Sequence, residues 1–178
     1  MQIINRGIMF LTIVVPSEDI MGGADEWART LKQANDAKQA ETDRQTQRTA
    51  MNRSIIAQQM PTIWEDLIKE FNNYCNAYNE GFKPERPLTL HRSGTYEFRV
   101  RPDALEEIVL GHYSHENWMI GITTRPGVVE WFEPQVYQVG AGKVELASRG
   151  GPQMSLGSIA GKKIKEGLAM AGLIQPGQ

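Results

Sequence analysis

Residues 88–101 read Leu-Thr-Leu-His-Arg-Ser-Gly-Thr-Tyr-Glu-Phe-Arg-Val-Arg, and their alternation decides the fold class. The even positions carry mostly apolar side chains, whereas every odd position is polar. This period of two predicts β-structure with one buried face and one solvated face. The alternation keeps its phase across Ser93 and Gly94, so this pair is either a bend within one strand or the turn of a hairpin.

Four further runs of β-type sequence follow, at 105–113, 117–124, 128–139 and 143–148. The connections between them are too short for crossover helices, so they predict an antiparallel meander of about five strands. Pro134 lies inside the third of these runs. Because proline cannot donate a hydrogen bond to a sheet, it predicts an edge position, a bulge or a broken strand there.

An amphipathic helix is predicted immediately before the sheet. Its apolar residues recur at alternating steps of four and three: Met60, Trp64, Leu67, Phe71, Tyr74 and Tyr78. This stripe predicts a helix that packs on the buried face of the meander. Pro61 predicts a break or kink, and Thr62 and Glu65 have the spacing of a capping box that begins a new helix. Gly81 predicts its end.

Residues 24–59 have a helical composition with no glycine or proline, but the stretch 35–49 contains no apolar residue except alanine. A helix that is polar all round has no face to bury. The sequence therefore predicts a helical arm or one half of a helical hairpin, with partial disorder of residues 35–50 as the alternative.

The expected fold is α+β, with an N-terminal helical arm or hairpin, an antiparallel meander of about five strands and a short C-terminal helix. Helical spacing of Leu156, Ile159, Ile164 and Leu168 predicts that last helix. We expect the chain to consist of three regions: an apolar segment at 1–23 that is a strand or disordered, a helical region at 24–80, and the sheet with the C-terminal helix at 81–178. We expect 62–80 to pack with 81–178 as one domain.

The apolar run at 8–15 is too short to span a membrane, so no membrane span is expected. Three interpretations of residues 1–20 stay open: a buried strand, a short export signal, or sequence upstream of a true start at Met21. The single cysteine, Cys75, excludes an intrachain disulfide framework and is typical of a reducing compartment, which favours a cytoplasmic protein.

The formal net charge of −2 excludes the global basic field typical of sequence-independent nucleic-acid binding, although a local patch stays open. The sequence contains no metal, phosphate-loop or catalytic motif, so we expect no cofactor and favour a protein without enzymatic activity. The alternative is a small-molecule or anion-binding protein, or an enzyme, that uses polar groups on the sheet. The candidate residues of such an anion or ligand site are His91, Arg99, Arg101, His112 and His115.

The leading hypothesis is a non-enzymatic protein–protein interaction or assembly module that acts through its N-terminal helical region. A long helix with apolar residues only at its two ends gains little stability in an isolated monomer. The expected partner is a second copy of the chain or a larger protein. The candidate interaction residues are Trp27, Leu31, Ile55, Ile56, Met60 and Trp64.

Overall fold

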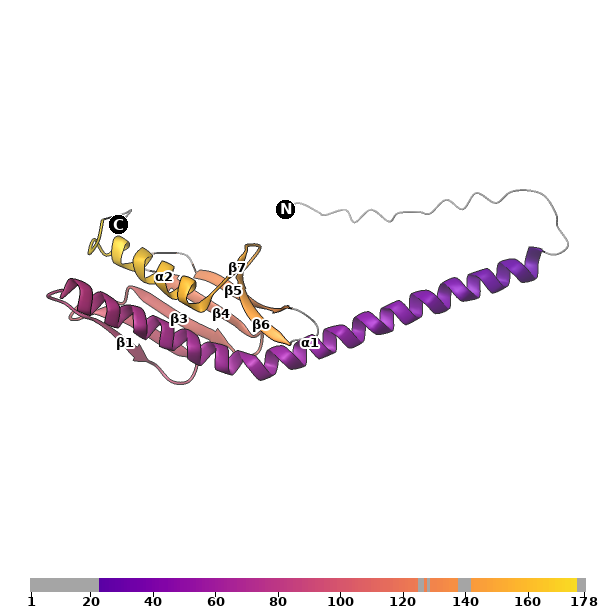
Figure 1. The fold of residues 1–178 in the computed structure, drawn as a ribbon, viewed down its shortest axis with the longest axis horizontal. Coiled ribbons are helices and arrows are strands. Elements are labelled where there is room, and N and C mark those ends of the chain that lie inside the picture. Colours follow the sequence, from indigo (N-terminus) through magenta and orange to yellow (C-terminus); the bar gives the residue numbers. More distant parts are fainter. Residues whose placement is uncertain (1–22, 125–126, 128, 138–141, 176–178) are drawn as a thin grey trace. The chain divides into compact units, whose positions relative to one another are not determined.

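The computed structural model describes residues 23–124, 127, 129–137 and 142–175 (Figure 1). Within them it has two helices and seven strands, in the order α1 (Gly23–Phe82), β1 (Leu88–Arg92), β2 (Glu97–Pro102), β3 (Val109–Ser114), β4 (Met119–Thr124), β5 (Val129–Tyr137), β6 (Lys143–Ser148), β7 (Gln153–Met154) and α2 (Leu156–Met170). Each strand pairs antiparallel with the next, so the sheet is a meander. The α+β fold class is confirmed, with seven strands where the sequence predicted about five.

The chain divides into two compact units, 1–47 and 48–178, and α1 contributes residues to both. In the first unit, the described residues 23–47 are helical and exposed. The second unit contains the rest of α1, the sheet and α2. The alternatives for residues 1–20 fall outside the described residues.

Helix α1 continues through Pro61, so the predicted break, the predicted new helix at Thr62 and the helical hairpin are wrong, whereas a kink at Pro61 stays a prediction. Proline removes one intrahelical hydrogen bond and costs about 3 kcal/mol inside a helix. The flanking Met60 and Trp64 are fully buried, and burial of an apolar side chain contributes about 1.5–3 kcal/mol. Glu65 does not cap a helix; its carboxylate accepts two hydrogen bonds from the Arg92 guanidinium at 2.6 and 2.9 Å.

The hydrophobic core lies between the sheet and the helices, because α2 and the C-terminal part of α1 cover the same face of the sheet (Figure 1). The ring of Phe98 lies 4.7 Å from that of Phe71 and 5.4 Å from that of Trp64, measured between centroids. A Cβ atom on Gly111 would lie 2.1 Å from the Phe98 ring, so only glycine leaves room for this ring on the sheet. The part of the stripe from Met60 to Phe71 therefore packs where the sequence placed it, whereas Tyr74 is 40% exposed.

Two strands account for the difference in strand number. The segment 88–101 is a hairpin, with Gly94 in the left-handed region at a φ of 79°. Strand β7 has only two residues and carries no alternation that could reveal it. Pro134 pairs with Leu146 of β6, whereas the pairing with β4 ends at Phe132, so the proline borders strand β6 alone.

Side-chain amides of α1 pair with the backbone of strands β1 and β6. At β1, the Asn79 amide donates to Leu88 O at 2.9 Å and accepts from Leu88 N at 2.7 Å. At β6, strand β7 pairs only with Leu146 and Ala147. The Gln59 amide accepts from Val144 N at 3.0 Å there and donates to Gly142 O. Both amides thus replace part of a missing neighbouring strand, which limits edge-to-edge association.

Replacing Asn79 with alanine is expected to lower the free energy of unfolding by about 1–2 kcal/mol. The variant loses two hydrogen bonds to the backbone of Leu88, and each contributes a modest net free energy. Urea denaturation followed by circular dichroism measures the change. Asn72→Ala is the matched control, since Asn72 is an exposed asparagine on the same helix. Equal midpoints for the two variants would contradict a stabilising role for the Asn79 amide.

Candidate functional site

The N-terminal part of α1 exposes two large apolar side chains on a helix that is exposed at every residue from 23 to 51. Trp27 is 65% exposed and Leu31 is 40% exposed. They are four residues apart and therefore adjacent on one side of the helix, which we call the Trp27–Leu31 face. Several side chains here form hydrogen bonds within the helix, such as Thr30 Oγ1 to Glu26 O at 2.9 Å.

The structure separates the six predicted interaction residues into two groups. Trp27 and Leu31 are exposed in the first unit, whereas Met60 and Trp64 are 0% and 2% exposed in the core of the second. The Trp64 indole N–H also donates to Thr95 O at 2.8 Å. Ile55 and Ile56 are partly buried and pack against the same core. A partner can therefore reach Trp27 and Leu31, while Met60 and Trp64 are covered by the chain itself.

Four of the five predicted ligand residues share the face of the sheet opposite the core. His91 lies opposite Arg99, Arg101 opposite Thr89, and His112 opposite Glu97. His115 lies in the turn after β3, where its ring is 6.0 Å from that of Tyr96. All three histidines are exposed to solvent.

Carboxylates neutralise the centre of this polar face. The Arg99 guanidinium lies 2.7 Å from a Glu97 carboxylate oxygen and 3.0 Å from one of Glu107. The hydrogen bond and charge of Glu97, and then those of Glu107, raise the pKa of Arg99 above its ordinary value. An anion would have to compete with these two carboxylates. In the described part of the chain, no three metal-ligating side chains are grouped closely enough to hold an ion. Anion or ligand binding at this face stays a prediction.

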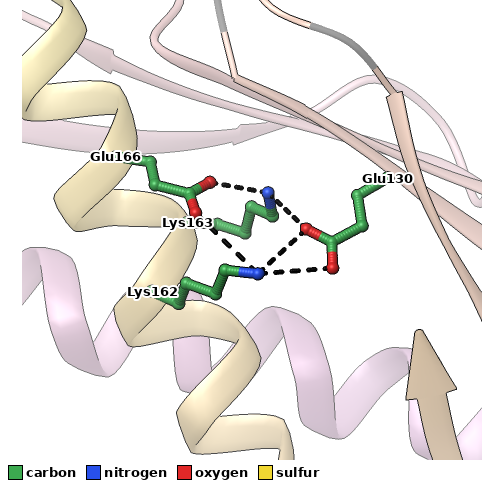
Figure 2. Close-up of polar contacts among 4 residues, drawn as sticks. All are labelled: Glu130, Lys162, Lys163 and Glu166. Atoms are coloured by element: carbon green, nitrogen blue, oxygen red, sulfur yellow. Dashed lines mark hydrogen bonds and ion pairs between the residues drawn. The ribbon is translucent and has the colours of Figure 1, made fainter. Parts of the chain in front are cut away.

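A charged cluster inside the second unit was not predicted from the sequence (Figure 2). Glu130 extends from β5 toward three residues of α2, namely Lys162, Lys163 and Glu166. Lys163 Nζ lies 2.7 Å from a Glu130 oxygen and 2.6 Å from a Glu166 oxygen. Lys162 Nζ lies 3.2 Å from Glu130 and 3.9 Å from Glu166. The sequence did carry one signal for this cluster. Glu130 is two residues from Phe132 in β5, and alternate residues of a strand point to the same face, so Glu130 points to the face on which Phe132 is buried.

The charges of this cluster balance, with two ammonium groups and two carboxylates. Lys163 is only 4% exposed. Burial alone lowers the pKa of Lys163, but the hydrogen bonds that its ammonium group donates to Glu130 and Glu166 outweigh this effect and raise the pKa above 10.5. Burial likewise raises the pKa of Glu130, and hydrogen bonds from Lys163 and Lys162 reverse this, so that its pKa lies below 4.5. The four groups satisfy one another and join α2 to the sheet.

Cys75 is expected to resist alkylation in the folded protein. Its side chain is 1% exposed in the core, and burial raises the pKa of the thiol to about 12. The thiolate is the reactive form, so iodoacetamide should modify Cys75 only as fast as the chain unfolds. Mass spectrometry with and without guanidinium measures this. Prompt modification of the native protein would contradict burial of Cys75.

Comparison with known proteins gave no match to a family model, a curated protein or a solved structure. Among the described helices, none combines the length and the apolar character needed to cross a membrane. The function must therefore be inferred from the residues of this chain.

Proposed function

We propose that this chain is a non-enzymatic protein–protein interaction or assembly module that acts through the N-terminal part of α1 and associates with a second copy of itself. One observation carries the proposal: Trp27 and Leu31 are exposed together on a helix in which residues 23–51 are all exposed.

Helix stability in proteins comes mainly from packing an amphipathic face, and helical propensity contributes less. The Trp27–Leu31 face is bordered by Ala24, Ala28 and Ala34, which lie three or four positions from Trp27 or Leu31. This gives the segment one short apolar face and a polar remainder. Covering Leu31 and Trp27 in an interface removes apolar surface from water, at about 25 cal/mol per Å².

Light scattering on the full chain at tens of micromolar tests the proposal. We expect a mass above the 20.0 kDa of one chain, and a decrease in that mass for Trp27→Asp, because a carboxylate at the centre of the interface opposes its desolvation. Met51→Asp is the matched control, since Met51 is a 53% exposed apolar residue on the same helix. A wild-type chain that remains monomeric, or an assembly that Trp27→Asp leaves intact, would overturn the proposal.

A further inference from the structure

The second unit carries an apolar groove of about 330 Å³ between the C-terminal part of α1 and α2. Aromatic rings of Tyr74, Tyr78 and Phe82 line the α1 side. The other side is aliphatic, with Ile164 and Leu168 of α2 and Ile174 beyond it.

Glycine brings the two helices close together along this groove. A Cβ atom on Gly161 would lie 2.8 Å from the Tyr74 ring, so a larger residue would force the ring away. The Tyr78 and Phe82 rings are 5.1 Å apart, and Phe82 is 71% exposed. An exposed phenylalanine beside an open apolar groove is typical of a protein-binding site.

The Trp27–Leu31 face suits the groove in two ways: it is a helical face with apolar anchors, and it carries a negative charge that can meet a positive one. Apolar residues four positions apart on a helix are the usual anchors in a groove between helices. Lys165 is the single charged residue among the described side chains that line the groove. Glu26 immediately precedes Trp27 in the first turn of α1 and flanks this face, where it can pair with a cation, whereas Asp25 lies two positions from Trp27 and so on the far side of the helix. Arg29 lies two positions from both Trp27 and Leu31, which places it on the far side of that helix.

We infer that the groove between α1 and α2 receives the Trp27–Leu31 face of a second copy of this chain. This inference rests on the proposed function and names the surface that the N-terminal part of α1 contacts. Two copies exchange these elements reciprocally, so that one dimer contains two equivalent contacts.

Light scattering with two single variants and their mixture tests the inference. Trp27→Asp removes the inserted residue, and Phe82→Asp places a charge in the groove at an exposed position that does not contribute to the core. Each variant alone is expected to raise the dimer dissociation constant at least about tenfold, which corresponds to about 1.4 kcal/mol. Circular dichroism verifies that both variants are folded.

An equimolar mixture of the two variants is expected to recover association. The Phe82→Asp copy keeps an intact Trp27–Leu31 face, and the Trp27→Asp copy keeps an intact groove, so the mixed dimer retains one of the two contacts. Met51→Asp should leave the mass unchanged. The expected set of results is loss of the dimer in both variants and partial recovery in the mixture.

The other outcomes separate the two proposals. If Trp27→Asp dissociates the dimer and Phe82→Asp does not, the groove is overturned while association through α1 stands. If both variants dissociate but their mixture remains monomeric, the reciprocal contact is likewise overturned. If the wild-type chain is monomeric, or Trp27→Asp has no effect, the proposed function and this inference both fail.

Discussion

Replacing Phe71 with alanine is expected to lower the free energy of unfolding by about 3–5 kcal/mol. Phe71 is fully buried, and its ring contacts that of Phe98, which itself covers Gly111 on the sheet. Removing the ring leaves a cavity between helix and sheet that the neighbouring rings cannot fill without moving. Guanidinium denaturation followed by far-ultraviolet circular dichroism measures the loss.

Phe82→Ala is the matched control, because it makes the same chemical change on the same helix at a residue that is largely exposed. Its effect should stay within about 0.5 kcal/mol. Both variants should be measured well below the concentration at which copies associate, since association stabilises the folded state by mass action. Similar losses in the two variants would show that the helix does not form the core with the sheet.

Local sequence patterns predicted the parts of this fold that depend on residues near one another in the chain. The alternation in 88–101 predicted β-structure with one buried and one solvated face, and the structure places Leu90 opposite Val100 and His91 opposite Arg99 in this pattern. The short connections predicted the meander, and the spacing from Met60 to Tyr78 predicted the helix that covers it. Each of these features repeats over several residues, so a single exception such as Arg92 does not hide it.

Contacts between distant residues could not be predicted in this way. Whether α1 stops at Pro61 depends on the burial of Met60 and Trp64 against strands that come later in the chain. The Gln59 amide pairs with Gly142 and Val144, more than eighty positions away, and has no local signature. Strand β7 exists because the chain returns beside Leu146, and its two residues are too few to form a pattern.

The candidate site was predictable only where it depends on a local sequence pattern. Trp27 and Leu31 stood out as apolar residues in a polar helix, and the structure leaves both exposed. Met60 and Trp64 belong to the same apolar pattern as the core helix, so sequence alone could not assign them to the core or to an interface. The groove next to Phe82 requires α1 and α2 to meet, and nothing in either helix alone indicates that they do.

Removing both carboxylates around Lys163 is expected to lower the free energy of unfolding by about 3–5 kcal/mol. In the double variant Glu130→Ala with Glu166→Ala, the buried ammonium group loses both partners that lie within 2.7 Å. Either single replacement leaves one partner in place. The double variant should therefore lose more stability than the two single variants added together. Guanidinium denaturation of the four proteins measures this coupling.

Adding Lys163→Met to the double variant should recover a large part of the loss, because methionine fills the buried space without a charge. Lys162→Met is the control: Lys162 is exposed, and Lys163 keeps both carboxylates, so the effect should stay below about 1 kcal/mol. A double variant as stable as the wild type would mean that Lys163 reaches water in the folded chain. A triple variant no more stable than the double variant would mean that the loss does not come from the unpaired charge.

The same cluster fixes the direction of the pH dependence. The pKa of Glu130 in the folded chain lies below its ordinary value of 4.5, so its contribution is present above pH 4.5 and is lost as the pH falls through the folded pKa. The pKa of Lys163 lies above 10.5, so its contribution is present below pH 10.5 and is lost as the pH rises through the folded pKa. The difference in unfolding free energy between the wild type and the double variant should therefore be greatest between these limits and should shrink as the pH falls below 4.5. Denaturation of both proteins at pH 7 and at pH 3 gives the difference in their free energies of unfolding at each pH. An equal difference at the two pH values would show that the loss comes from packing of the glutamate side chains, since packing does not depend on their charge.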